Sequence, residues 1–297
     1  MDSAGSRRFL IINADDYGLA PGVTAAILDL ARRGAITSAS AIVTMPGSAE
    51  ALAAARAVDL DLGLHLNLCA GTPLSPPDAV PSLLSSGATR SPRFATAGEL
   101  QWRYLSGRLD LDEVRRECRA QIDRFLATGA TPSHLDSHCH LHALPRLYRL
   151  TVELAGQYGI PGVRRAASNF IFRPPRLPLF SRVVGFPRYD ASPYAPYQSN
   201  YFSVLTVMGP ARTPRPLHAL LRALPDGVTE LVCHPGYVDD ELLSIDTLTH
   251  AREREWLLLT RPHLGEALTR EGIRLVSWRA MARQVVSTIS FSRRAQR

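Results

Sequence analysis

The chain has 297 residues, 45% of them hydrophobic and 21% charged, a composition that excludes a disordered chain, a collagen-like repeat and a small disulfide scaffold. Its 34 basic residues are all arginines and, with 27 acidic residues, they give a formal net charge of +7. Because these arginines come in scattered pairs rather than in a clustered stripe with interleaved aromatic residues, we expect no nucleic-acid partner.

Short apolar runs alternate with helical patterns along the chain. Strands are predicted at 9–13, 40–44, 62–66, up to about 136, near 163, and at 202–207, 230–233 and 273–278. Helical patterns lie between them, and the clearest is 111–127, whose apolar residues recur at three- and four-residue spacing. Strands that alternate with helices pair in parallel through right-handed crossovers. We therefore predict an α/β fold, a single catalytic TIM-like (β/α) barrel domain over residues 1–297 with about seven parallel strands.

One segment interrupts this alternation. Residues 166–200 contain six prolines and seven aromatic residues. A loop of this length in a compact domain is usually functional or disordered. Its aromatic content predicts an insertion that forms either an ordered lid or a contact in a homodimer.

The cysteines and the termini indicate the compartment. The four cysteines show no CxxC spacing, which favours reduced, buried thiols; they are Cys69, Cys118, Cys139 and Cys233. The first eight residues are polar, and the apolar run after them is too short for a secretory signal. No apolar run approaches the ~20 residues that span a bilayer. We expect a cytoplasmic protein without a membrane span.

A pair of aspartates follows one predicted strand, and a histidine lies within another. Asp15 and Asp16 come directly after the first strand, where adjacent carboxylates repel each other unless a cation or a proton lies between them. A helix N-cap would also explain Asp16. His65 lies in an apolar strand, where a single histidine is more often a core residue than a ligand. Neither position indicates a site when taken alone.

A histidine-rich run is the strongest signal in the sequence. The segment HLDSHCHLH begins at His134 and contains four histidines in nine residues. Its polar functional residues all have even numbers, so an extended strand would place them on one face, although a turn near His138 would separate them. Further along, His234 follows an apolar strand and precedes a Pro-Gly turn that would hold it at the rim. Such clustering favours metal ligation or proton transfer.

Carboxylates and imidazoles at the ends of different strands meet at the catalytic face of a barrel. Such groups can hold a divalent metal with an open position for water or substrate. The metal lowers the pKa of that water and polarises a carbonyl. A second carboxylate could accept the water's proton and a histidine could protonate the leaving group. The pattern predicts metal-assisted hydrolysis of an amide or ester, with one aspartate as base and the other as ligand.

With these motifs, the sequence resembles the YdjC-like carbohydrate deacetylases, a family that includes chitooligosaccharide and hopanoid-associated deacetylases. The resemblance runs from Asn13 to Trp278. It rests on the NADDYG segment at Asn13, the GAITSAS segment at Gly34, the GLHLNL segment around His65, the HLDSHCHLH run and the CHPG turn at His234.

This resemblance implies a (β/α) barrel with one divalent metal held by an aspartate and two histidines. The matching positions are Asp16, His65 and His138. It further implies that Asp15 is the general base and His234 the general acid, although the division of roles between the two aspartates stays open. Imidazole ligands favour zinc, whereas magnesium prefers oxygen ligands, so we expect Zn²⁺ or Mg²⁺.

Other positions are predicted to face the substrate. His140 and His142 match family positions expected to contact the sugar or the ligands. Arg164, after a predicted strand, could bind a sugar or a phosphate, with a surface salt bridge as the alternative. The predicted reaction removes the N-acetyl group of an N-acetylated amino sugar, free or in a small glycan, and releases acetate. The alternatives are a metal-dependent phosphoesterase on a related barrel and a non-catalytic glycan-binding protein.

Overall fold

The computed structural model describes residues 8–86, 92–164, 200–203 and 215–282. The predicted insertion at 166–200 therefore lies outside the described residues, except for Asn200. A helix long and apolar enough to cross a membrane is absent from the described part of the chain.

The strands form one sheet in which all pairings between named strands are parallel. Six strands follow the order β4-β3-β2-β1-β6-β5, and the short β7 pairs beside them with β1. Their bounds are β1 Arg8–Tyr17, β2 Ser38–Ala41, β3 Leu62–Leu66, β4 Leu135–Ser137, β5 Asn200–Ser203, β6 Gly227–Cys233 and β7 Arg274–Leu275. The predicted α/β class with parallel strands is confirmed. The described residues show no pairing between β4 and β5, so closure into a barrel stays a prediction.

Strand β1 lies at the centre of this sheet. On one edge it pairs with β6 from Arg8 to Ala14, and on the other with β7 at its start and with β2 further on. Its residues from Leu10 onward are buried, as expected for a strand covered on both faces. The register with β2 shifts between Ala14 and Tyr17, and Asp16 has a φ of 70°. This irregularity changes the direction in which the side chains of the two aspartates near the end of the strand point.

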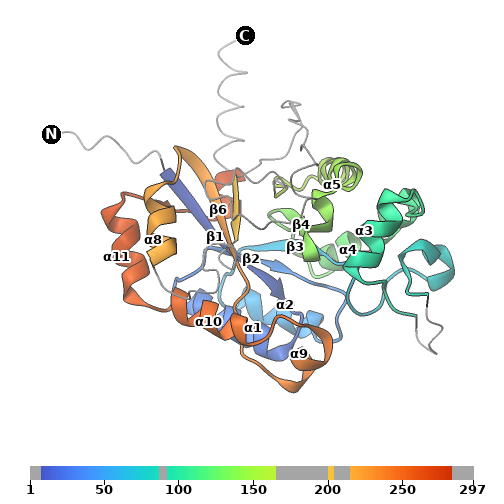
Figure 1. The fold of residues 1–297 in the computed structure, drawn as a ribbon, viewed down its shortest axis with the longest axis horizontal. Coiled ribbons are helices and arrows are strands. Elements are labelled where there is room, and N and C mark those ends of the chain that lie inside the picture. Colours follow the sequence, from blue (N-terminus) through green and yellow to red (C-terminus); the bar gives the residue numbers. More distant parts are fainter. Residues whose placement is uncertain (1–7, 87–91, 165–199, 204–214, 283–297) are drawn as a thin grey trace, which may run out of the picture.

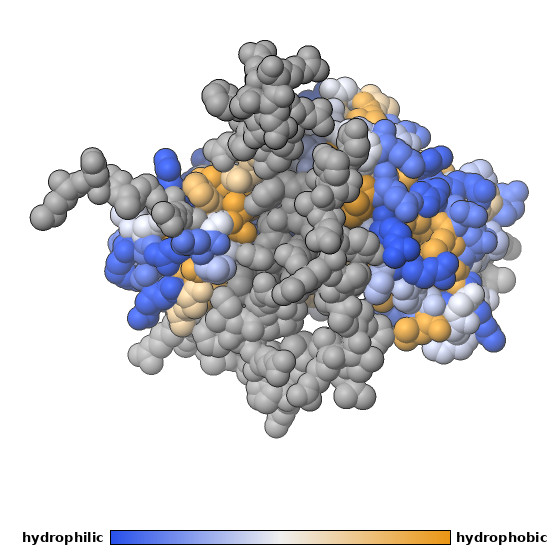
Figure 2. All heavy atoms as spheres, turned by 90° about the horizontal axis from the view of Figure 1, so that it is seen from above, coloured by the Kyte–Doolittle hydropathy of each residue, from blue (hydrophilic) through white to orange (hydrophobic). Residues whose placement is uncertain are grey.

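Helices surround the sheet (Figure 1). α3, α4 and α5 lie toward one end and α8 and α11 toward the other, while α1, α2, α9 and α10 lie along the lower side in that view. Their bounds are α1 Pro21–Arg32, α2 Ser48–Arg56, α3 Ala97–Leu105, α4 Leu111–Leu126, α5 Pro145–Gln157, α8 Arg215–Arg222, α9 Asp240–Ile245, α10 His250–Leu259 and α11 Pro262–Arg270. Where described residues reach the upper face, hydrophilic side chains predominate at both ends (Figure 2).

The predicted helix at 111–127 is confirmed as α4. Asp110 caps its first turn by accepting hydrogen bonds from two backbone N–H groups, and its apolar stripe packs Val114, Ile122 and Phe125 into the core. Helix α3 was not predicted, although Thr96 and Glu99 form the reciprocal capping box that marks its start.

Candidate active site

The site lies where the carboxyl ends of neighbouring strands meet. Strand β1 carries Asp15 and Asp16 just before its last residue, and β3 carries His65. Strand β4 carries Asp136 and is followed by His138, and β6 is followed by His234. Because β4, β3, β2, β1 and β6 are consecutive in the sheet, residues far apart in the sequence gather at one edge.

Asp16 is the centre of a set of possible metal ligands. Its Oδ1 lies 2.8 Å from Nδ1 of His138 and 3.3 Å from Nε2 of His65. One donor atom from each of the three residues lies within 4.8 Å of the others. Asp16 and His65 are each 1% exposed. A buried carboxylate with two imidazoles suits a divalent transition metal.

Arg252 of α10 fixes the other oxygen of Asp16. The distance from its Nη2 to Oδ2 is 2.6 Å, and the same Nη2 lies 2.6 Å from Asp246. Although burial opposes ionisation, His138 and Arg252 hold the pKa of Asp16 well below its usual value. The carboxylate therefore stays charged and presents Oδ1 to the imidazoles.

Asp136 orients His65. Its Oδ1 lies 2.7 Å from Nδ1 of the imidazole, which leaves Nε2 directed toward the aspartates of β1. Burial disfavours the charged imidazole, but the carboxylates of Asp136 and Asp15 raise the pKa of His65 to about 10. A carboxylate on the far nitrogen is the usual way of fixing the tautomer of a metal-binding histidine.

Asp15 is held by Arg164 rather than by the histidines. The Nη1 and Nη2 groups of Arg164 each donate to one Asp15 oxygen at 2.7 Å, and Asn13 donates to Oδ1 at 2.8 Å. Burial raises the pKa of Asp15, but the neighbouring Arg164 and His65 outweigh it and lower that pKa. The guanidinium also lies 2.7 Å from Asp136 and 3.0 Å from Glu230.

Arg164 is thus a buried partner of three carboxylates, with 1% of its surface exposed. A surface salt bridge is not what the structure shows, because the residue lies inside the molecule. Its predicted contact with a sugar or phosphate stays a prediction, and its observed contacts position Asp15.

His234 lies on the other side of Asp15. Its Nε2 is 3.9 Å from Asp15 Oδ2, and its backbone N–H donates to Glu255 at 2.6 Å. Burial lowers the pKa of His234 and raises that of Glu255 to about 7. The His234 Nδ1 atom has no hydrogen-bond partner among the described residues.

The sequence left two alternatives for the histidine-rich run, one extended face or a turn near His138, and the structure shows the turn directly after Ser137. There the chain enters the 3-10 helix η3 (His138–Ala143), in which Cys139 and His140 take left-handed φ angles of 53° and 52°. His140 is half-buried, whereas His142 is buried and bonds Ser137 Oγ at 2.7 Å. Burial lowers the pKa of these imidazoles to about 4 and about 3.

His134 is a packing residue. Its ring stacks on Trp278 at 4.6 Å and lies so close to Gly63 that a Cβ there would be 2.2 Å from the imidazole. Its Nε2 is 3.0 Å from Ser40 Oγ. It therefore supports β3 and β4 from beneath the site.

Two cysteines border the ligand set. Cys139 is exposed and Cys69 half-buried, so the prediction that all four thiols are buried is wrong for this pair; Cys118 and Cys233 are buried. A hydrogen bond from Cys69 lowers the pKa of the Cys139 thiol.

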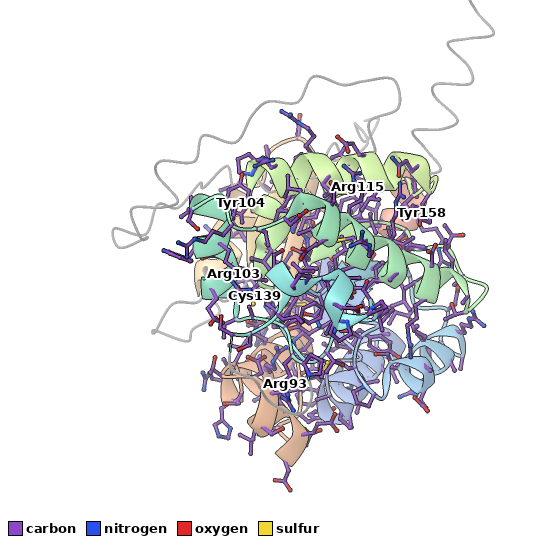
Figure 3. The ribbon with its side chains drawn as sticks, turned by 90° about the vertical axis from the view of Figure 1, so that its right-hand side faces the viewer. Arg93, Arg103, Tyr104, Arg115, Cys139 and Tyr158 are labelled. Carbon is purple, nitrogen blue, oxygen red and sulfur yellow. The ribbon has the colours of Figure 1, made fainter. Side chains whose placement is uncertain are left out.

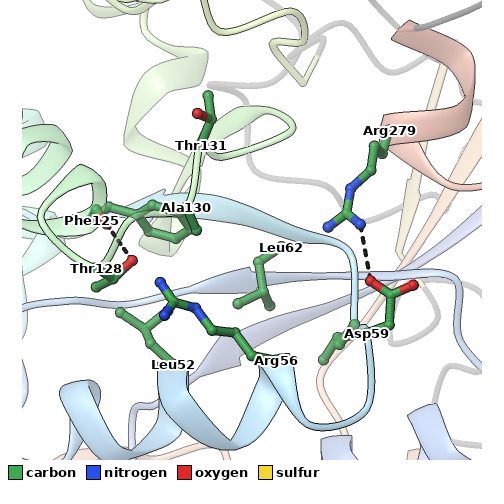
Figure 4. A pocket seen from close by; sticks show the side chains of 10 residues that line it. Leu52, Arg56, Asp59, Leu62, Phe125, Thr128, Ala130, Thr131 and Arg279 are labelled. Atoms are coloured by element: carbon green, nitrogen blue, oxygen red, sulfur yellow. Dashed lines mark hydrogen bonds and ion pairs between the residues drawn. The ribbon is translucent and has the colours of Figure 1, made fainter.

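A pocket at the opposite end of the sheet lacks these groups (Figure 4). It lies by the start of β3 and before β4, and its polar side includes Arg56 and an ion pair between Asp59 and Arg279 at 3.2 Å. No histidine or cysteine is among the described residues that line it. The grouped carboxylates and imidazoles lie instead at the carboxyl edge of the sheet.

Several residues of the site were missed from the sequence. Arg252 and Glu255 lie on a helix whose local pattern gives no signal of a site, and nothing in the sequence distinguishes Glu230 and Asp136 from their neighbours in the predicted strands. Their roles depend on contacts across more than 20 residues of sequence.

Comparison with known proteins places these observations in a family. The profile of the YdjC-like proteins matches residues 9–270. The chain is 32% identical over 276 residues to a carbohydrate deacetylase of Geobacillus stearothermophilus, with 92% of this chain and 97% of that protein covered. It is 29% identical over 281 residues to a chitooligosaccharide deacetylase of Yersinia pestis (strain Pestoides F), with 91% and 98% covered.

A solved structure also has this fold. It comes from Enterococcus faecalis V583 and is described as a candidate cellobiose-phosphate cleavage protein. The TM-score is 0.74 at 27% sequence identity, and the match covers 93% of this chain and 99% of that one. The similarity therefore extends over most of the chain rather than over the motifs alone.

Proposed function

The chain belongs to the YdjC-like protein family, and we propose that it is a metal-dependent carbohydrate deacetylase. It hydrolyses the N-acetyl group of an N-acetylated amino sugar and releases acetate. The relatives named as carbohydrate and chitooligosaccharide deacetylases support the substrate class. The observation that carries the proposal is a buried aspartate-histidine-histidine set beside a second, arginine-held carboxylate.

The ligands in this proposal are Asp16, His65 and His138. They fit a divalent ion because their donor atoms lie within 4.8 Å of one another and because Arg252 and Asp136 already fix the remaining polar atoms of Asp16 and His65. When bound, such an ion lowers the pKa of a water molecule and polarises a carbonyl. Two imidazole ligands favour zinc over magnesium.

Asp15 is the general base. Both of its oxygens accept hydrogen bonds from Arg164, which keeps the carboxylate charged and sets its orientation. We assign the ligand role to Asp16 because it is the aspartate within 2.8 Å of His138. Asp15 then takes the proton of the attacking water.

His234 is the general acid. Its Nε2 lies 3.9 Å from Asp15, and the hydrogen bond from its backbone to Glu255 holds the turn that carries it. Because burial lowers its pKa, a protonated His234 gives up its proton readily to the departing amine. Asp15 thus acts on the water that attacks the carbonyl carbon, and His234 acts on the amide nitrogen.

Acetate release tests the proposal. Metal-free protein reloaded with Zn²⁺ or Mg²⁺ is assayed with N-acetylglucosamine and its short oligomers. We expect metal-dependent acetate release that falls by about 10²-fold or more in Asp15→Asn, since general-base catalysis contributes that much, and that is lost in His138→Ala. The exposed His263→Asn is the matched control.

Two outcomes would contradict this function. One bound metal per chain without acetate release would indicate that the substrate is another amide, an ester or a phosphoester. Absence of both bound metal and activity would favour a non-catalytic glycan-binding protein.

A further inference from the structure

The thiols of Cys69 and Cys139 lie together at the edge of the candidate active site. One donor atom each from Cys69, Cys139 and His138 lies within 4.8 Å of the other two. Figure 3 labels Cys139 on the side of the molecule that faces the viewer there. The proposed hydrolysis uses neither sulfur atom, so the cluster needs a separate explanation.

The backbone presents both sulfur atoms from fixed positions. The Asn67 side chain, which is buried, accepts hydrogen bonds from the backbone N–H groups of Cys69 and Ala70 at 3.1 and 3.0 Å. Cys139 follows Ser137, the last residue of β4, by two positions and has a left-handed backbone with φ 53° and ψ 20°. Two separate segments, one after β3 and one after β4, thus converge on one point.

We propose that Cys69, Cys139 and His138 form a second metal site, which takes a soft divalent cation such as zinc or cadmium. Two thiolates and one imidazole are a donor set that such ions prefer, with Zn–S and Zn–N bonds of about 2.3 and 2.0 Å. Magnesium is excluded, because it binds oxygen ligands and keeps its waters. The exposure of Cys139 leaves a coordination position open to solvent.

This site competes with the proposed catalytic one. His138 belongs to both donor sets, and its Nδ1 lies 2.8 Å from Asp16 Oδ1. A soft cation held by the cysteines draws the imidazole away from Asp16, so excess zinc or cadmium inhibits the enzyme. This consequence rests on the proposed function, whereas binding by the thiols does not.

Cobalt absorption tests the site. The full-length, metal-free protein, reduced with a phosphine, is titrated with Co²⁺, because thiolate ligands give an intense near-ultraviolet charge-transfer band that oxygen and nitrogen ligands do not. We expect the band in the wild type and in Asp16→Asn, which lacks the carboxylate ligand of the proposed catalytic site. We expect its loss in the Cys69→Ser, Cys139→Ser double variant, and its retention in the control Cys118→Ala, whose thiol is buried elsewhere.

Thiol protection in the wild type tests the site without any substitution, so a misfolded variant cannot affect the result. Cd²⁺ should protect Cys69 and Cys139 from a disulfide reagent, and Mg²⁺ should not. Either single serine variant should bind Cd²⁺ about tenfold or more weakly, the size of effect seen on loss of even an outer partner.

The proposal is overturned if reduced wild type binds Co²⁺ without the band, if the band survives in the double variant, or if it disappears in Asp16→Asn. An inactive enzyme that still shows the band would overturn the proposed deacetylase and leave the thiol site standing. An active enzyme without the band would overturn the thiol site and leave the proposed deacetylase standing.

Discussion

Arg164 is in contact with Asp15, Asp136 and Glu230 at once, and it lies within the core. Removing a single partner of such a buried ion cluster leaves uncompensated charge, which typically costs about 3–5 kcal/mol. The position therefore matters for stability and for the ionisation of Asp15.

We expect Arg164→Met to lower the free energy of unfolding by about 3–5 kcal/mol, measured by urea denaturation. Arg164→Lys keeps the positive charge but not the paired N–H donors, so this variant should fold and yet have a lower kcat/KM. The paired hydrogen bonds from Arg164 help to lower the pKa of Asp15, so their loss in Arg164→Lys should move the acid limb of the kcat/KM profile to higher pH. An unchanged acid limb would contradict the positioning role.

Glu255 gives the fold a predictable dependence on pH. Burial raises the pKa of its carboxyl from 4.5 to about 7, so between these values the folded chain binds more protons than the unfolded chain. The contribution of Glu255 to the free energy of unfolding is complete below pH 4.5, is lost as the pH rises to about 7, and stays lost above pH 7.

Glu255→Gln should abolish this loss while keeping an oxygen for the His234 N–H. The difference between these two pKa values corresponds to about 3 kcal/mol at most, so the variant should be more stable than the wild type by up to that amount at pH 8 and similar to it at pH 4.5. Unfolding free energies measured across this range check the sign, with the exposed Glu266→Gln as control. A variant that is less stable at pH 8 would contradict the prediction.

Strands β3 and β4 pack so closely that one glycine sets their separation. A Cβ on Gly63 would lie 2.2 Å from the His134 ring, and that ring is confined by Trp278. His65, two residues further along β3, depends on the same separation.

Gly63→Ala should therefore lower the free energy of unfolding by about 1–3 kcal/mol and weaken metal binding by displacing His65. Gly265→Ala is the matched control, since open space surrounds Gly265 in α11 and alanine is favoured over glycine in a helix by about 0.5–1 kcal/mol. Thermal unfolding and metal titration of the two variants separate the outcomes. Equal stability of the two variants would show that His134 can move.

The elements differ in how far the sequence alone predicts them. Strand β1 and helix α4 follow from a continuous apolar run and from helical spacing, and both were predicted. A turn near His138 was one of the two alternatives from the sequence, but its left-handed backbone at Cys139 and His140 was not predicted, because the turn contains no glycine. The roles of Arg252 and Glu255 could not be predicted either, because only tertiary packing brings α10 against β1 and β6.

For the molecule as a whole, the proposed ion contributes to stability as well as to chemistry. A ligand that binds only the folded state at 100 times its Kd adds about 2.7 kcal/mol. In the Cys69→Ser, Cys139→Ser variant, which lacks the proposed thiol site, we expect Zn²⁺ to raise the unfolding temperature, EDTA to reverse this, and the further change Asp16→Asn to remove the response. The exposed Asp78→Asn should keep it. Zn²⁺ stabilisation that persists when Asp16→Asn is added to the double cysteine variant would place the ion elsewhere.

The central position of β1 has a consequence for biosynthesis. The strand's aspartates emerge from the ribosome first, but their cationic partners Arg164 and Arg252 follow about 150 and 240 residues later, as the separations of 149 and 236 positions require. Its neighbour β6 also comes from the far end of the chain. A nascent chain that already contains Asp16, His65 and His138 thus lacks the countercharges that keep the site together. Contacts of such long range slow folding, and the site is completed only after nearly all of the domain has been synthesised.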